Sequence, residues 1–171
     1  QFAGNLGRAQ GIPTLINSIE SINHKNLEFH FYGLGTHLDF ILKSNDKKVF
    51  YKGTFNRKES NKYINLCDVA IVTLENKMLG LGVPSKTYNI LCAGKPILYI
   101  GDTKSEIAIM IKNNNIGYLA EAGNINNIIK GIHWFSNLSK KEMKSIKLNC
   151  RNLILDRYLK TDILKQYSEI V

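Results

Sequence analysis

Short apolar segments alternate with longer amphipathic ones along most of the chain. The strand-like segments share aromatic or β-branched residues and flanking turn residues: Phe29–Gly33, Val49–Gly53, Val69–Leu74 and Ile97–Ile100, with weaker candidates at Phe2–Gly4 and Gly117–Ala120. Behind Pro13, which suits a first helical turn, apolar residues recur at helical spacing over Ile12–Ile22. Repeated alternation of strand and helix predicts an α/β fold, a parallel sheet of about six strands with helices on both faces.

Further helical patterns complete this alternation. We expect helices at Leu38–Leu42, Ser60–Leu66, Ser85–Cys92, Glu106–Ile111 and Ile125–Phe135. After Ser136 the strand-like segments stop, and the pattern predicts two final helices, Lys140–Asn149 and the amphipathic Ile154–Ile170. The 171 residues suffice for one well-packed domain, 1–171. Because the chain opens directly in a strand, we expect a domain boundary at its start and a partner domain before it.

The charge of the chain narrows the classes of partner. The formal net charge is +9 and the pI is about 9.4, which would suit a nucleic acid or an anionic membrane surface. The lysines are spread along the whole sequence, and no basic stripe interleaved with aromatic residues occurs. This distribution argues against nucleic acid and favours a solvated, lysine-rich surface, while a peripheral contact with an anionic membrane stays open.

The cysteines and the hydropathy indicate the compartment. Cys67, Cys92 and Cys150 lie far apart, without a CxxC motif or a histidine at ligand spacing. We therefore interpret all three as small core residues in a reducing compartment. No apolar run approaches the roughly 20 residues that a membrane span requires. The sequence predicts a cytoplasmic domain.

The richest candidate site lies in the segment Leu79–Ile100, LGLGVPSKTYNILCAGKPILYI. A loop with Gly82 and Pro84 leads through Ser85 and Lys86 into a short apolar helix. Glycines allow a ligand to approach closely, and free N–H groups at a helix start combine with the lysine cation to bind an anion. The segment predicts a phosphate or diphosphate site with Lys86 as its charge, and Ser85 has the alternative role of a helix cap.

The loop after the first strand, Gly4–Gly11, lies at the edge where open α/β sheets bind ligands. It holds Gly7 and Arg8, and the planar guanidinium of arginine suits a phosphate. The alternative is that its glycines serve turn geometry alone and Arg8 is solvated. Glu75, just after the fourth strand, is the one acid at this edge, and a solvated loop acid is the simpler interpretation.

Two more loops follow strands at the same edge. Gly33 ends the second strand and could bring the backbone close to a ligand or form a plain turn. After the third strand, the backbone around Thr54 could bond a base edge while Phe55 covers the ring. The alternative places Phe55 in the core.

Taken in chain order, these segments resemble a known domain. GNLGRAQGIPTLINSI is similar to a glycine loop and first helix, and FHFYGLGTHLDFI to a second strand with its glycine turn. VFYKGTFNRKESNKYINLCDVAIVTL resembles a base-binding loop, helix and strand, and VPSKTYNILCAGKPIL the helix that carries a donor diphosphate and ribose. With SEIAIMIKNNNIGYLAEAGNINNIIKGI, nearly the whole chain resembles the C-terminal, donor-binding domain of a GT-B glycosyltransferase, close to retaining family 4 and its bacterial capsule and O-antigen members.

The resemblance implies a Rossmann-like, doubly wound domain that forms one half of a GT-B fold, with the N-terminal acceptor domain absent from this chain. It implies retaining transfer of a hexosyl or N-acetylhexosaminyl group from a nucleotide-diphosphate sugar, UDP-linked, to a glycan or lipid-linked acceptor of bacterial surface polysaccharide, without a metal cofactor. Arg8 and Lys86 would stabilise the departing diphosphate. The implied donor contacts are Gly7, Gly33, Thr54, Phe55, Gly82, Pro84, Ser85 and Asn89.

The chain departs from the family pattern in three places. The family carries two glutamates about seven residues apart, and Leu81 and Asn89 stand at these places. Asn89 can bond a hydroxyl but gives no charge-assisted bond, generally worth roughly 1.5–3 kcal/mol. Gln10 stands where many members have a basic residue, for which Arg8 could compensate. A non-catalytic nucleotide-binding module and a basic nucleic-acid-binding domain therefore stay open as alternatives, and we expect the isolated domain to bind donor without transferring sugar.

Overall fold

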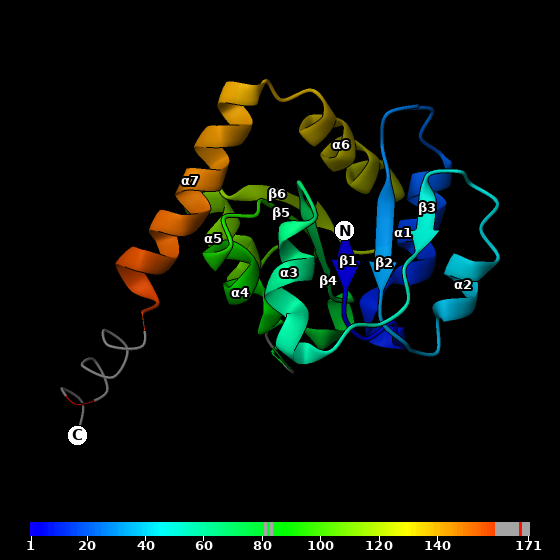
Figure 1. Ribbon diagram of the computed structural model, residues 1–171, viewed down its shortest axis with the longest axis horizontal. Helices are drawn as coiled ribbons and strands as arrows, with labels where there is room; N and C mark the ends of the chain where they lie inside the picture. Colours follow the sequence, from blue (N-terminus) through cyan, green and yellow to red (C-terminus); the bar gives the residue numbers. More distant parts are fainter. Residues whose placement is uncertain (81, 83, 160–167, 169–171) are drawn as a thin grey trace.

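The computed structural model describes residues 1–80, 82, 84–159 and 168. A parallel sheet of six strands in the order β3-β2-β1-β4-β5-β6 lies between helices (Figure 1). The strands are β1 (Phe2–Ala3), β2 (Phe29–Tyr32), β3 (Val49–Tyr51), β4 (Ala70–Thr73), β5 (Ile97–Gly101) and β6 (Gly117–Glu121). The strand order reverses at β1, which confirms the predicted doubly wound, Rossmann-like fold, the two weaker strands included.

The helices follow the predicted alternation. They are α1 (Ile12–Glu20), α2 (Leu38–Leu42), α3 (Ser60–Asn65), α4 (Lys86–Cys92), α5 (Glu106–Asn114), α6 (Ile125–Ser136) and α7 (Lys140–Arg157), with 3-10 turns η1 (Arg8–Gln10), η2 (Arg57–Glu59) and η3 (Asn76–Met78). Pro13 lies in the first turn of α1, as the sequence predicts. The side chains of Ser105, Asn124 and Ser139 cap α5, α6 and α7 by accepting a backbone N–H.

Two apolar clusters hold the layers together, one on each face of the sheet. Side chains alternate between the faces along a strand, so Ile71 and Leu98 pack toward α1 and α6, whereas Val72 and Tyr99 pack toward α4, α5 and α7. Every residue of β4 and β5 is buried. Burial on both faces is typical of central strands in a parallel sheet, and it explains their continuous apolar sequence.

The predicted break between the two C-terminal helices, after Asn149 and before Ile154, is wrong. Residues 140–157 form one continuous helix, because Ile146, Cys150, Leu153 and Ile154 make a single buried stripe that runs through the supposed break. The rest of the predicted segment Ile154–Ile170 reaches residues 160–167 and 169–171, which lie outside the described residues.

The cysteines divide into three environments. Cys150 is buried, its thiol donates to the Ile116 carbonyl oxygen at 3.6 Å, and burial raises its pKa to about 12. Cys67 is half-buried. The prediction of a core position is wrong for Cys92, which is exposed because it ends α4 on the solvent side. All three thiols are free.

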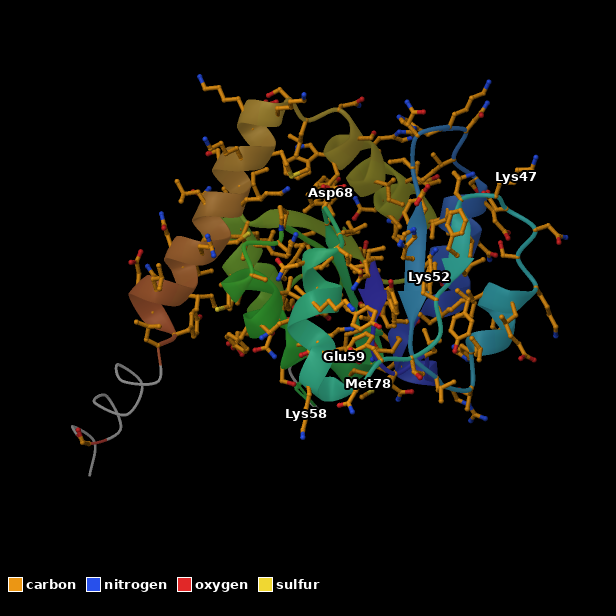
Figure 2. The ribbon with its side chains drawn as sticks, in the orientation of Figure 1. Lys47, Lys52, Lys58, Glu59, Asp68 and Met78 are labelled. Atoms are coloured by element: carbon orange, nitrogen blue, oxygen red, sulfur yellow. The ribbon has the colours of Figure 1, made fainter. Side chains whose placement is uncertain are left out.

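The basic side chains are dispersed over the surface. Figure 2 shows Lys47 and Lys52 near the β3 edge of the sheet and Lys58 beside α3, well apart from one another. Within the described residues, no helix combines the length and the apolar character needed to cross a bilayer.

Candidate functional site

The loops that follow β1 and β2 lie directly on each other at the carboxyl edge of the sheet. The Gly4 N–H donates to the Tyr32 carbonyl at 3.0 Å, and the Leu6 N–H donates to the Leu34 carbonyl at 2.8 Å. A Cβ at Gly33 would collide with the Gly4 carbonyl oxygen. Gly33 therefore allows two backbones to touch, and its contact is with Gly4.

Lys86, the first residue of α4, reaches beneath the first of these loops. Its Nζ donates to the Ala3 carbonyl oxygen at 3.1 Å and lies 4.2 Å from the centroid of the Phe2 ring. A Cβ at Gly4 would lie 3.2 Å from this nitrogen. Burial lowers the pKa of Lys86 to about 8. Among the described residues, no carboxylate pairs with the ammonium, so its charge is desolvated without a counter-ion.

Two cavities meet at Lys86. One, of about 350 Å³, has Phe55 and Asn89 in its wall, and the other, of about 320 Å³, has Gly82 and Pro84. Both are also lined by Gly4, Ser85 and Lys86. The structure thus brings together six of the predicted site residues from the loop after β3, the loop before α4 and α4 itself: Phe55, Gly82, Pro84, Ser85, Lys86 and Asn89. We call the two spaces the Phe55 cavity and the Pro84 cavity.

Ser85 does not cap α4 by its side chain, although it occupies the N-cap position. The backbone at Ser85 is already helical, with φ −56° and ψ −26°, whereas a capping serine has an extended backbone. The capping alternative is therefore wrong. Because α4 has only seven residues, its dipole is short, and Lys86 is the main positive group of the Pro84 cavity.

Phe55 belongs to an aromatic group at the wall of its cavity. Its ring stacks on Tyr63 with centroids 4.4 Å apart and an interplanar angle of 14°, and it meets Tyr32 edge-on at 5.6 Å. Phe55 is half-buried and belongs to neither apolar core cluster. Sequence reasoning missed Tyr32 and Tyr63, although both are aromatic neighbours of the predicted base loop. Of the three rings, Phe55 lines the cavity, and the two tyrosines pack against it from outside the lining. A ring held in this way can contact a planar group of a ligand.

The remaining predicted residues lie outside both cavities. Gly7 is the N-cap of η1, Arg8 is exposed in η1, and Thr54 is exposed. In the described part of the chain, Arg8 has neither a hydrogen bond nor an ion pair. Gln10 lines the Pro84 cavity instead, and its Oε1 accepts from the Thr73 hydroxyl at 3.2 Å.

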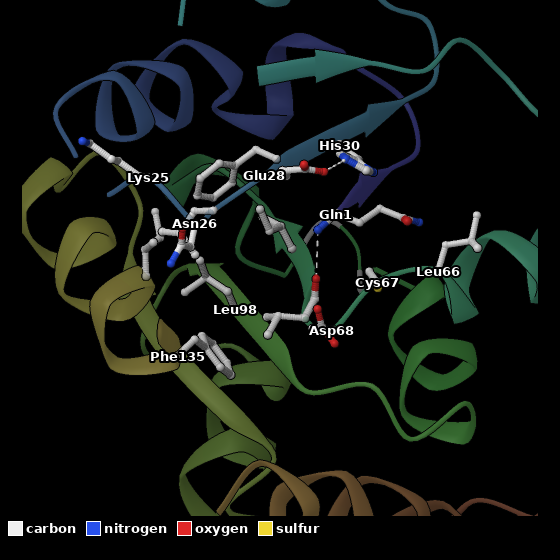
Figure 3. A pocket seen from close by; sticks show the side chains of 15 residues that line it. Gln1, Lys25, Asn26, Glu28, His30, Leu66, Cys67, Asp68, Leu98 and Phe135 are labelled. Carbon is white, nitrogen blue, oxygen red and sulfur yellow. Dashed lines mark hydrogen bonds and ion pairs between the residues drawn. The ribbon is translucent and has the colours of Figure 1, made fainter. Parts of the chain in front are cut away.

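A larger cavity, of about 560 Å³, lies at the opposite edge of the sheet, where the strands begin (Figure 3). Among its polar groups, the His30 Nε2 and a Glu28 carboxylate oxygen are 2.8 Å apart, and the N-terminal nitrogen of Gln1 donates to the Val69 carbonyl at 2.9 Å, whereas the Gln1 Oε1 is buried without a partner among the described residues. None of the predicted site residues lines it. Open parallel sheets bind ligands at the carboxyl ends of their strands, so the cavities at Lys86 are the candidate site.

The described residues hold no group of three or more His, Cys, Asp or Glu side chains placed to share a metal ion. The chemical character of the site is instead one desolvated cation between an aromatic wall and a glycine loop. This arrangement can bind an anionic group that carries a planar ring.

Comparison with known proteins gives consistent matches. The family model described as glycosyl transferases group 1 matches residues 1–152. The probable glycosyltransferase WbjE of Pseudomonas aeruginosa is 38% identical over 122 residues, which are 69% of this chain and 30% of that protein.

Solved structures share the fold at low identity. TarM has a TM-score of 0.72 at 21% identity, covering 98% of this chain and 34% of TarM. A glycosyltransferase of Rickettsia africae ESF-5 has a TM-score of 0.76 at 17% identity, and the match covers 99% of this chain and 45% of that protein. WaaG, a glycosyltransferase involved in lipopolysaccharide biosynthesis, has a TM-score of 0.69 at 12% identity, and the match covers 97% of this chain and 45% of WaaG. The chain spans less than half the length of each of these proteins.

Proposed function

The chain belongs to the group 1 glycosyl transferases, and from this premise we propose that it is the donor-binding half of a retaining GT-B enzyme. The proposed donor is a nucleotide-diphosphate sugar, UDP-linked, that gives up a hexosyl or N-acetylhexosaminyl group. The proposed acceptor is a glycan or a lipid-linked glycan, held by an N-terminal domain. We place this transfer in bacterial surface polysaccharide synthesis, in the cytoplasm at the inner face of the membrane. The role of WaaG in lipopolysaccharide biosynthesis supports the first part of this proposal.

The observation that carries this proposal is the environment of Lys86. Its ammonium faces two cavities, and its protein neighbours are one carbonyl oxygen and one aromatic ring. A desolvated charge without a counter-ion is costly, so the site favours a ligand that supplies the negative charge. A diphosphate would supply this charge in the Pro84 cavity, which Gly4 and Lys86 both line.

The two cavities suggest how such a donor would lie. The base would rest on the aromatic wall at Phe55, and the Asn89 amide would bond a ribose hydroxyl. The diphosphate would lie at Lys86, whose charge would stabilise the leaving group as the glycosidic bond breaks. Arg8 is the proposed second cation, and it would have to turn from η1 toward the Pro84 cavity.

A thermal-shift panel tests the proposal. UDP or a UDP-sugar at about 100 times its Kd is expected to add roughly 2.7 kcal/mol to the free energy of unfolding. We propose that no metal is required, so an excess of EDTA should leave the shift unchanged. Nucleic acid should give no comparable shift at physiological salt, because its contacts weaken steeply with salt. No shift with any nucleoside diphosphate at millimolar concentration would contradict donor binding.

A binding module without turnover is the competing function, favoured by the neutral Asn89 where a charge-assisted bond would strengthen ribose binding. An acceptor-dependent transfer assay separates the two. The 171-residue chain should bind UDP but not transfer sugar, since half a cleft neither orients the acceptor nor excludes water. A longer chain with the preceding domain should transfer. Binding without transfer by the longer chain would favour the module.

A further inference from the structure

A third cavity continues the row along the carboxyl edge of the sheet. It has a volume of about 360 Å³ and shares Leu74, Gly82 and Pro84 with the Pro84 cavity. Its remaining wall comes from the ends of β4 and β5 and the start of α5, including Tyr99 and Asp102. We call it the Tyr99 cavity. A ligand that passes Lys86 from the Phe55 cavity would enter this space next.

Tyr99 presents an unpaired polar group in the wall of this cavity. The side chain is fully buried, and its hydroxyl makes no hydrogen bond of ordinary length among the described residues, although the Ser105 side chain lies near enough to offset part of the rise that burial causes in its pKa. The neighbouring Ser105 hydroxyl is committed to the start of α5, where it donates to the Asp102 carbonyl at 2.8 Å and accepts from Ala108 N–H at 3.2 Å. A buried hydroxyl left unpaired is unfavourable, so a ligand that bonds it would gain affinity.

The protonation state of this hydroxyl is set by its surroundings. Burial raises the pKa of Tyr99, and the nearby Asp102 charge adds to the rise while Ser105 opposes it. The phenol therefore keeps its proton at neutral pH and can both donate and accept a hydrogen bond.

The charges of the row are separated. Lys86 supplies a cation where the Phe55 and Pro84 cavities meet. The Tyr99 cavity is lined by the half-buried carboxylates of Glu75 and Asp102 and by two exposed charged residues, Lys104 and Glu106, so carboxylates outnumber ammonium groups there by three to one. Glu106 is engaged, because its carboxylate accepts from the Tyr88 hydroxyl at 2.7 Å. A diphosphate is attracted to Lys86 and repelled by the carboxylates, which accept hydrogen bonds from neutral hydroxyl or amide groups.

We propose that the Tyr99 cavity is the subsite for the sugar of the donor and that it selects neutral sugars over acidic ones. Tyr99 bonds a sugar hydroxyl, and Asp102 and Glu75 accept from hydroxyl or amide donors. The same two carboxylates repel the carboxylate of a uronic acid. This inference rests on the proposed donor binding, and it assigns specificity to the turn between β5 and α5.

Titration calorimetry of the 171-residue chain with UDP, UDP-glucose and UDP-glucuronic acid tests this assignment. Tyr99→Phe should weaken UDP-glucose binding by about three- to tenfold and leave UDP binding unchanged, because it deletes one neutral hydrogen bond to the sugar. Asp102→Asn should tighten UDP-glucuronic acid binding relative to UDP-glucose. The matched control is Tyr118→Phe on the neighbouring strand β6, outside the cavity, which should change none of these affinities.

Folding and binding outcomes remain separable. Tyr99→Phe should leave the melting temperature equal or raise it, because the hydroxyl has no protein partner to lose. If UDP binds and Tyr99→Phe leaves the UDP-glucose affinity unchanged, the sugar subsite is overturned while donor binding stands. If UDP itself does not bind, the proposed function and the subsite fail together. A lower melting temperature would show that the hydroxyl is bonded in the free protein, which also overturns the assignment.

Discussion

Glycines occur in two regions at the carboxyl edge of the sheet, and the two regions use them differently. After β1 and β2, the glycines let backbones touch: a Cβ at Gly33 or Gly35 would collide with the loop of Gly4 and Leu6. In the loop before α4, a Cβ at Gly80 or Gly82 would meet nothing within 4 Å. The first region is closed by its own backbone, whereas the second leaves room beside the cavities.

Lys86 links these two regions. It begins α4 immediately after the open loop, yet its ammonium is anchored to the Ala3 carbonyl in the closed region. Glycines of the first region therefore serve packing, whereas glycines of the second leave space for a ligand. The sequence pattern G-x-G does not distinguish these two roles.

Gly33→Ala should break the closed region and have the largest effect. Its φ of 131° and the collision with Gly4 predict a loss of about 3 kcal/mol in the free energy of unfolding, measured by urea denaturation. Gly53→Ala is the matched control, with φ 80° but nothing within 4 Å of the added Cβ, and should cost about 1 kcal/mol. Equal losses for the two variants would show that the backbone contact carries no stability.

Lys86→Met tests the link between the regions. The affinity for UDP should fall by about 10- to 100-fold, since a charge-assisted contact is lost, while the free energy of unfolding stays equal or rises because a desolvated cation is removed. Lys47→Met, at an exposed position far from the cavities, is the control for charge (Figure 2).

Arg8→Ala should weaken UDP binding less than Lys86→Met does. Unchanged UDP affinity in both Lys86→Met and Arg8→Ala would mean that the phosphates bind elsewhere.

The pH dependence of UDP binding also tests the role of the Lys86 charge. Because burial lowers the pKa of Lys86 to about 8, the free protein loses this charge above pH 8 and UDP binding must take up a proton. Calorimetry between pH 7 and 9 should show the affinity falling above pH 8, by up to about tenfold per pH unit. A slope that persists in Lys86→Met would assign it to another group.

For folding, the sign of this pH effect is reversed. The unfolded chain keeps Lys86 protonated up to about its ordinary pKa of 10.5, so the unfolded state binds more protons between pH 8 and 10.5. The contribution of Lys86 to the free energy of unfolding should therefore rise with pH through that range.

Gly82→Ala should have the smallest effect on stability and tests the open region. With nothing within 4 Å of the added Cβ, the free energy of unfolding should change by less than about 0.5 kcal/mol. The added methyl narrows the Pro84 cavity, so UDP should bind a few-fold more weakly. A loss of stability as large as that of Gly33→Ala would erase the distinction between the two regions.

The sequence predicts the strands and the doubly wound order well, because buried parallel strands read as apolar runs between turn residues. The prediction of helix ends from the sequence fails at residues 150–153. There, Cys150 and Leu153 continue the buried stripe of α7, and the residues against which this stripe packs lie on distant elements. The sequence also predicts that Lys86 belongs to the site, but not that its ammonium lies under Gly4, since such burial depends on two loops that meet only in the fold. The orientation of the Arg8 side chain likewise depends on the fold around its loop and could not be predicted from the neighbouring sequence.

The central strand of the sheet has a consequence for how the chain folds. Phe2 in β1 pairs with Phe31 on one side and with Ile71 on the other, and it is fully buried. Each pairing closes a long loop, and the entropy of closure is lost before the contact stabilises the chain. On the ribosome, Phe2 is made well before Ile71, so β1 must wait for β4 before it is enclosed. The folding rate should therefore depend on this late loop closure, and conservative substitutions at Phe2 should slow folding more than they speed unfolding.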